Sequence, residues 1–231
     1  MSSGRLVLVA TPIGNLQDLS ARASKELSEA TFWIVEDTRV SGKLLTVLGV
    51  SKPMRVLNEH TPDHRVQAFA KEIAEGTTVT LLTDGGCPSI SDPGARLVDL
   101  CAYLDVEIDS IPGPSAVTNA LALSGFFAQQ FAFLGFPARK PGDIRDLFKP
   151  FADSTLTLVF FESPFRFMKT LEIIAEVLGE RRVVICREMT KIHQEIVRSN
   201  LTNLAQMREI GQKGEFTIVI EGRRRKRIAD D

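Results

Sequence analysis

The amino-acid sequence predicts an α/β protein built from two domains. Short continuous apolar runs, such as LVLVA at 6–10 and TVTLLT at 78–83, are typical of strands buried on both faces of a sheet. Segments with helical spacing of apolar residues lie between these runs. The length of 231 residues, of which 44% are hydrophobic and 25% charged, is ample for a globular core. Such alternation indicates a mostly parallel sheet in the first half of the chain.

The first domain is expected over residues 1–125, with about five strands. Two of its helices are predicted to end where a glycine follows, at Gly49 and Gly76. The expected strands are 6–10, 31–35, 54–57, 78–83 and 106–111, and the expected helices are 19–30, 41–49, 63–76 and 95–104.

The second domain is expected over residues 126–222. Its strands lie close together in sequence near the end, which favours a mixed, partly antiparallel sheet. The expected strands are 131–136, 155–161, 182–187, 194–199 and 215–222, and the expected helices are 142–152, 164–178 and 201–211. Residues 223–231 carry the basic run RRRKR, either a disordered, solvated tail or a contact for phosphate.

The composition limits the location of the protein. The three cysteines, at positions 87, 101 and 186, are odd in number and form no C-x-x-C motif, which favours a reducing compartment. No apolar stretch approaches the roughly 20 residues of a membrane span. A strand-like segment begins directly after Arg5, so we expect no signal peptide and a soluble cytoplasmic protein. The net charge of −1 gives the whole molecule no general affinity for nucleic acid.

Five unusual loops follow the five expected strands of the first domain. They are rich in Gly, Pro, Asp and Glu, and they read TPIGN at 11–15, EDTR at 36–39, NEHTPDH at 58–64, DGGCPSISDPG at 84–94 and PGPSA at 112–116. In an open parallel sheet, ligands bind beyond the carboxyl ends of the strands. The sequence therefore predicts a ligand cleft at this rim.

Several common sites are absent or weak. The chain has no G-x-G-x-x-G after its first strand, no P-loop and no G-x-S-x-G motif, which argues against a usual dinucleotide site, an NTPase and a serine hydrolase. His60 and His64 resemble a metal pair, but Pro62 between them disfavours a helical arrangement, so a polar loop is the favoured reading and no metal is expected. The many prolines and few cations of the rim favour a weakly charged cofactor over a triphosphate.

Seven segments together resemble one known family. They are ATPIGNLQDLS, EDTRVSGKLL, DGGCPSISDPG, PGPSAV, FESPFR, REMTKIHQE and KGEFTIVIEG, in order from about residue 5 to 222. This set closely resembles the 16S rRNA cytidine 2′-O-methyltransferase branch of the tetrapyrrole methylase superfamily. The resemblance implies a class III S-adenosylmethionine (SAM) methyltransferase fold of two α/β domains, with SAM between them. It also implies a homodimer that methylates a cytidine ribose in 16S rRNA of the assembled 30S subunit.

The resemblance also implies which positions contact the cofactor. Gly86, Cys87 and Pro88 match a Gly-Asp-Pro motif after the fourth strand, and Cys87 departs from the hydroxyl residue that the branch usually has there. Carried over position by position, the cofactor-binding residues are Pro12, Ile13, Gly14, Asp84, Gly86, Cys87, Ile90, Ser115, Ala116, Phe161 and Gly214.

Methyl transfer to a ribose hydroxyl needs positioning and is helped by a base or a cation near the oxygen. The candidate catalytic residues on the rim are Asp37, Arg39, Glu59 and Glu162, and the sequence does not choose a base among them. Asp37 and Arg39 are equally consistent with a structural ion pair. For RNA, the candidate phosphate contacts are Arg39, Arg139, Lys140, Arg166 and the tail, and the candidate stacking rings are Phe165 and Phe167, which are at least as consistent with a helix core.

Two other functions stay open at this point. One is a methyltransferase of the same fold that acts on a corrinoid or another small molecule. The other is a non-catalytic RNA-binding or ribosome-binding protein that has kept the fold.

Overall fold

The computed structural model describes residues 4–204, 207, 210–211 and 213–224. The chain forms two compact units, residues 1–115 and 116–231, which we describe separately. Residues 116–124, which we placed in the first domain without predicting a helix there, form helix α5 (Ala116–Ser124), which contacts strands β7 and β10 of the second unit. Among the described residues, no helix is long and apolar enough to cross a membrane.

The first unit contains a parallel sheet of five strands, as the sequence predicts. The strand order is β3-β2-β4-β1-β5, and every neighbouring pair is parallel. The strands are β1 (Arg5–Val9), β2 (Phe32–Val35), β3 (Met54–Val56), β4 (Thr78–Leu81) and β5 (Glu107–Ile111). The helices are α1 (Ala21–Glu29), α2 (Thr38–Leu48), α3 (Asp63–Ala74) and α4 (Ala95–Tyr103), with a 3-10 turn at Leu16–Asp18.

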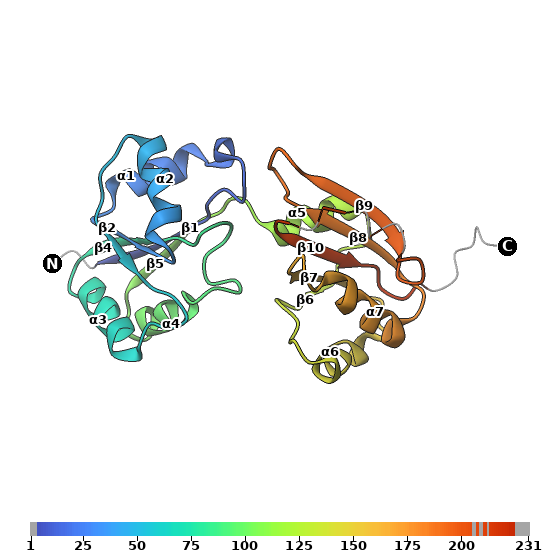
Figure 1. The fold of residues 1–231 in the computed structure, drawn as a ribbon. Helices are drawn as coiled ribbons and strands as arrows, with labels where there is room; N and C mark the ends of the chain where they lie inside the picture. The colour runs from blue at the N-terminus through green and yellow to red at the C-terminus, as the bar shows by residue number, and fades with distance from the viewer. Residues whose placement is uncertain (1–3, 205–206, 208–209, 212, 225–231) are drawn as a thin grey trace. The chain divides into compact units, whose positions relative to one another are not determined.

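Helices cover both faces of this sheet (Figure 1). Leu6 and Ile34 pack with α3 and α4, whereas Val7 and Trp33, their neighbours in sequence, pack with α1 and α2. Successive side chains of a strand point to opposite faces, so both faces can be buried only if the strand is apolar throughout. This double burial explains the continuous apolar runs of the sequence.

Helix α2 begins three residues earlier than we expected. Its first residues, Thr38 and Arg39, belong to the segment that we read as a loop. The Asp37 carboxylate accepts a hydrogen bond from the Arg39 backbone N–H at 2.8 Å, which caps the helix. The motif at 36–39 therefore contains the start of helix α2, directly after the carboxyl end of β2.

The second unit contains a mixed sheet, also as predicted. Its order is β6-β7-β10-β8-β9, in which only β6 and β7 are parallel. The strands are β6 (Phe131–Phe133), β7 (Thr157–Glu162), β8 (Arg182–Arg187), β9 (Glu195–Asn200) and β10 (Phe216–Ile220). Besides α5, the helices are α6 (Pro141–Phe148) and α7 (Phe167–Leu178), with a 3-10 turn at Lys149–Phe151.

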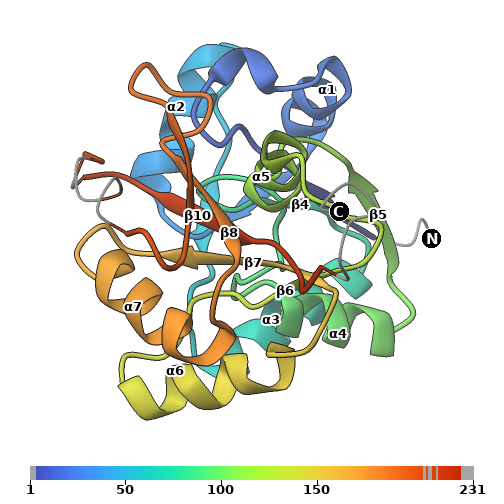
Figure 2. The ribbon, with the colours of Figure 1, turned by 90° about the vertical axis from the view of Figure 1, so that its right-hand side faces the viewer.

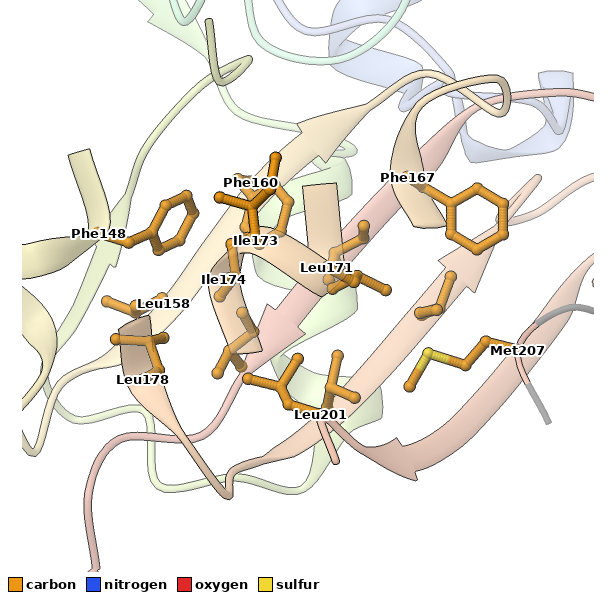
Figure 3. Close-up of a cluster of buried hydrophobic side chains, with 14 of the residues drawn as sticks. Phe148, Leu158, Phe160, Phe167, Leu171, Ile173, Ile174, Leu178, Leu201 and Met207 are labelled. Carbon is orange, nitrogen blue, oxygen red and sulfur yellow. The ribbon is translucent and has the colours of Figure 1, made fainter. Parts of the chain in front are cut away.

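Helices α6 and α7 lie next to each other and cover one face of this sheet (Figure 2). Figure 3 shows their apolar side chains, including Phe148 and Ile174, with Leu158 and Phe160 of β7. Phe167 is also part of this cluster, and its ring stacks on Phe216 with centroids 4.8 Å apart. The prediction that Phe167 could stack on a base is therefore wrong, because the ring is buried in the core.

Two expected helices of the second unit differ from the structure. The helix expected over 142–152 ends at Phe148 and continues as the 3-10 turn, where Pro150 cannot donate an α-helical hydrogen bond. The helix expected over 201–211 is wrong for 201–204, which form a turn and an isolated bridge between Asn200 and Asn203. Residues 205–206 and 208–209 of that segment, and 225–231 of the basic tail, lie outside the described residues.

Arg223 and Arg224, at the start of the expected tail, are described. Arg223 forms an ion pair with Asp153, and Arg224 forms one with Glu221. These two arginines therefore have carboxylate partners in the second unit.

Candidate active site

The loops after β1 and β4 of the first unit are joined by backbone hydrogen bonds. Thr11 N donates to Gly86 O at 2.9 Å, and Gly86 N donates to Thr11 O at 3.0 Å. The Thr11 hydroxyl also donates to Thr83 O at 3.1 Å. Strands β1 and β4 are neighbours in the sheet, so their loops leave the same edge and pair there.

Glycine at position 86 suits the backbone conformation of this loop. Gly86 has φ of 99°, a conformation that residues with a Cβ rarely adopt, and a Cβ there would lie 3.6 Å from Ile13 Cγ2. The Cys87 thiol lies beside the loop after β5, with Sγ 3.6 Å from Pro114 O. The structure thus brings together four predicted cofactor residues at the carboxyl ends of β1 and β4: Pro12, Ile13, Gly86 and Cys87.

Carboxylates gather beside these loops, at the carboxyl ends of β2 and β4. Thr83 donates its hydroxyl to Glu36 at 3.1 Å, and the charge of Glu36 acts on both Asp84 and Asp92. We call Glu36, Asp84 and Asp92 the acidic cluster. Within the described residues, none of the three forms an ion pair with a cation.

The acidic cluster changes the protonation of its own members. Burial is the main cause that raises the pKa of Asp92 to about 6; the hydrogen bond with Thr83 opposes this rise, and the charges of Glu36 and Asp84 add to it. Burial, followed by the charge of Glu36, also raises the pKa of Asp84. Asp92 therefore exchanges its proton near neutral pH, as a general base must.

Asp37 and Arg39, two predicted catalytic residues, form an ion pair. Arg39 Nη2 lies 2.5 Å from Asp37 Oδ2, and the Arg39 side chain is 89% exposed. Hydrogen bonds from the Arg39 side chain and backbone lower the pKa of Asp37 to about 2. The Asp37 carboxylate therefore stays ionised at neutral pH and caps α2.

Glu59, another predicted catalytic residue, is exposed in the turn after the edge strand β3. The turn is closed by Asn58, whose side chain accepts hydrogen bonds from His60 N and the Thr61 hydroxyl. The Arg96 guanidinium holds this turn by donating to Thr61 O at 2.8 Å. No group of three potential metal-ligating side chains exists among the described residues.

The remaining predicted residues of the first unit lie in loops at the same rim. Gly14 is exposed in a bend after β1. Ile90 is exposed between Ser89 and Ser91, which both have left-handed backbones with φ of 70° and 60°. The strained serines on either side of Ile90 fix the path of the loop that presents it. Ser115 is the last residue of this unit, and Ala116 begins α5 in the second.

In the second unit, Phe161 is the centre of an aromatic group. Its ring lies edge-on to Phe133 with centroids 5.0 Å apart, and at 5.3 Å from the ring of Phe136. These rings come from β6, from the loop after it and from the end of β7. They form an apolar group whose ring planes are inclined to one another by 67° and 53°.

Glu162 is buried and fully hydrogen-bonded. Its side chain is 1% exposed, and its carboxylate accepts hydrogen bonds from Ser163 N at 2.7 Å and from the Thr170 hydroxyl at 2.6 Å. Arg166 Nη2 lies 3.2 Å from the same carboxylate. This arrangement suits an anchor of the turn between β7 and α7 better than a freely accessible base.

Gly214 lies against a second carboxylate of this unit. Its φ is 104°, and a Cβ there would lie 2.5 Å from Glu188 Cγ. Glu188 accepts hydrogen bonds from Lys191 Nζ and Glu215 N, both at 2.9 Å. Burial would raise the pKa of Glu188, but these hydrogen bonds outweigh burial and lower it.

Sequence reasoning did not single out Asp92 as a site residue. Glu36, whose charge acts on Asp92, belongs to the loop after β2, so only the fold shows that the two carboxylates meet. The available signal was the segment ISDPG itself, in which an aspartate stands between turn-forming residues at the strand rim.

The comparisons with known proteins agree with this architecture. The family model for Tetrapyrrole (Corrin/Porphyrin) Methylases matches residues 5–205. A Thermotoga maritima protein named Ribosomal RNA small subunit methyltransferase I is 41% identical over 95% of this chain and 99% of its own length. Proteins of the same name from Mycobacterium bovis and Haemophilus influenzae are 43% and 36% identical over 96% of this chain and 79% and 80% of theirs.

Solved structures share the fold at lower identity. A diphthine synthase superposes with a TM-score of 0.75 at 14% identity, covering 94% of this chain and 89% of that one. The uroporphyrin-III-C-methyltransferase of Thermus thermophilus gives 0.66 at 19% identity, covering 95% and 93%. The chain belongs to the tetrapyrrole methylase family. Within that family, its similar curated relatives are the proteins named Ribosomal RNA small subunit methyltransferase I.

Proposed function

We propose that this protein uses SAM to methylate the ribose 2′-hydroxyl of a cytidine in 16S rRNA, on the assembled small subunit. The observation that carries this proposal is the identity of 36–43%, over almost the whole chain, to relatives named for small subunit rRNA methylation. We also propose a cytoplasmic homodimer. The three free thiols of the described residues suit a reducing compartment.

The chemistry of the predicted cofactor residues in each unit fits SAM. The cofactor carries a sulfonium and an ammonium group, which the carboxylates of the acidic cluster attract. Phe161 and its neighbouring rings offer an apolar contact for the adenine. We propose that the cofactor is held by Pro12, Ile13, Gly14, Asp84, Gly86, Cys87, Ile90, Ser115, Ala116, Phe161 and Gly214.

The bound cofactor supplies an electrophilic methyl carbon, whose bond to sulfur breaks as its bond to the ribose oxygen forms. The protein must align the hydroxyl oxygen with that carbon and accept the hydroxyl proton. Asp92, with a pKa of about 6, is better matched to accept a proton near pH 7 than Asp37, with a pKa of about 2. Glu59, exposed on the rim, is a second candidate base.

The Asp37–Arg39 pair and Glu162 have different proposed parts. The exposed Arg39 guanidinium is proposed to stabilise the developing alkoxide or a phosphate of the RNA. Glu162 is proposed to act as a positioning residue through Arg166. Neither role requires a metal ion.

The rival within the same fold is a methyltransferase that acts on a corrinoid or another small molecule. The rival of another class is a non-catalytic ribosome-binding protein. The retained Thr11–Gly86 pairing and the acidic cluster favour a working site over a site that has been lost.

The test incubates the purified protein with radiolabelled SAM and with 30S subunits that lack the modification. Label on the ribose of one rRNA cytidine is the expected result, and mapping the nucleotide identifies it. Free 16S rRNA serves as the comparison for the requirement of an assembled subunit. Tight binding of SAM without transfer of label to RNA contradicts the proposal.

A further inference from the structure

We propose that one surface of the second unit binds unpaired RNA bases by stacking and the adjoining phosphates by charge. It rests on the proposed function, because it names how the RNA substrate is held. We call it the aromatic-basic surface, and it consists of Phe136, Arg139, Lys140 and Phe165.

The two segments that carry this surface leave the same edge of the sheet. Strands β6 and β7 are parallel neighbours, so the loop 134–140 and the turn 163–166 both begin at their carboxyl ends. Phe161 N donates to Gly135 O at 2.8 Å, which joins the loop to the end of β7. The surface is therefore assembled by local topology within one unit.

Arg166 holds the two segments together. Its guanidinium donates to Pro137 O at 3.0 Å and to Ala138 O at 2.8 Å, between Phe136 and the two cations. The buried Glu162 carboxylate lies 3.2 Å from Nη2, the same nitrogen that donates to the two carbonyls. These contacts do not use Nε or Nη1, so the prediction that Arg166 contacts phosphate stays a prediction. The fixed arrangement lowers the entropy that the surface would lose on binding.

The two phenylalanines of the surface are exposed and take no part in the hydrophobic core. Phe165 is 87% exposed and Phe136 is 64% exposed, whereas Phe167, two residues further on, fills the core. The ring of Phe136 contacts the ring of Phe161, with centroids 5.3 Å apart, and this contact helps to fix the orientation of Phe136. An exposed aromatic ring on a supported loop is a platform for a flat ligand.

Two cations follow Phe136 in the loop that Arg166 holds. Arg139 and Lys140 are exposed, and neither forms an ion pair with any described residue. Aromatic rings combined with unpaired cations are how proteins bind single-stranded nucleic acid, because the rings stack on bases and the cations contact phosphates. A protein partner would favour a larger apolar patch with a polar rim, which these four residues do not provide.

The test measures the affinity for a 5′-labelled, cytidine-containing single-stranded RNA oligonucleotide by fluorescence anisotropy at several salt concentrations. Phe165→Ala is expected to weaken binding by about tenfold without changing the dependence on salt. Lys140→Ala is expected to weaken binding and to reduce the slope of log K against log salt by about 0.7, the value for one phosphate contact. The matched control is Phe127→Ala, since Phe127 is 65% exposed in the same unit but precedes the opposite end of β6.

Two further measurements separate this proposal from the proposed function. Affinity for SAM is measured by calorimetry, and methylation is measured on 30S subunits. RNA binding that depends on Phe165, in a protein that labels no RNA, supports the surface and rejects the reaction. If the protein labels 30S subunits, and Phe165→Ala equals Phe127→Ala in both RNA affinity and labelling, the proposed surface is wrong. The proposed reaction is then still supported.

The rival occupant of this surface is a second copy of the chain. Sedimentation velocity of wild type and Phe165→Ala decides between them. If the variant changes the oligomeric state and leaves RNA affinity unaltered, the surface joins two copies and our proposal is wrong.

Discussion

Two sets of carboxylates, one in each unit, have different surroundings. In the first unit, Glu36, Asp84 and Asp92 gather without a cation partner among the described residues. In the second unit, buried or half-buried carboxylates each have one: Glu162 with Arg166, Glu188 with Lys191 and Glu221 with Arg182.

This difference separates a site from a scaffold. Paired carboxylates stabilise the turns that they hold, and removing one member of a buried pair strongly lowers the free energy of unfolding. Unpaired carboxylates that raise one another's pKa destabilise the fold, and such groups persist where a ligand or a reaction uses them. The contrast therefore assigns charge chemistry to the first unit and a fixed frame with an exposed aromatic surface to the second.

The largest effect is expected when a paired carboxylate is removed. Glu162→Ala should lower the free energy of unfolding by about 3–5 kcal/mol, because Arg166 loses its carboxylate partner and the buried Thr170 hydroxyl and the half-buried Ser163 N–H lose their acceptor. Urea unfolding followed by circular dichroism measures this loss. The matched control is Glu172→Ala, an exposed glutamate on α7, which should change stability little. Equal stabilities of the two variants would show that Glu162 is no anchor.

The next effect compares a glycine from each unit. Gly214→Ala should cost about 2–3 kcal/mol, because the new Cβ would meet Glu188 at 2.5 Å in addition to the strain of φ near 104°. Gly86→Ala should cost about 1–2 kcal/mol, because only the strain of φ near 99° applies there. Thermal unfolding of both variants shows which substitution costs more stability. A larger loss for Gly86→Ala would contradict the proposal that Glu188 is held rigidly in the second unit.

The sequence predicted the first sheet well because its strands are buried on both faces. Continuous apolar runs are typical of such strands, so β1, β2 and β4 lie within one or two residues of their predicted ranges. Helix α5 was missed because Val117, Ala120 and Leu121 lie in a segment with few polar residues, which hides the helical period.

The site was predicted in part for a related physical reason. Loop residues next to a strand end, such as Pro12 and Gly86, follow from local sequence. The interaction of Asp92 with Glu36 depends on which strands become neighbours, and strand order is a property of the whole sheet. Likewise, only the start of α7 decides that Phe167 is buried and Phe165 is exposed.

A smaller effect is expected from the acidic cluster, with the opposite sign. The folded-state pKa of Asp92, about 6, lies above its ordinary value of 3.8, so the folded state keeps this proton to higher pH. Its contribution is favourable below about pH 4 and is lost as the pH rises through about 6. Asp92→Asn should therefore stabilise the protein by about 1 kcal/mol at pH 8, after allowance for partial exposure. Urea unfolding at pH 5 and pH 8 measures this, and a destabilised variant at pH 8 would remove the contrast between the units.

The smallest effect is expected at Cys87, where the chain departs from the pattern of its branch. Its thiol lies 3.6 Å from Pro114 O, and burial, followed by the charge of Asp92, raises its pKa, so the thiol stays neutral and can donate to that carbonyl. A threonine hydroxyl can donate to the same oxygen. Cys87→Thr should therefore change the affinity for SAM by less than about twofold, under 0.5 kcal/mol. Calorimetry of the variant beside Gly86→Ala decides the matter, because Gly86→Ala changes the backbone of the same loop. If Cys87→Thr has the larger effect, side chains and not the backbone shape this loop for its ligand.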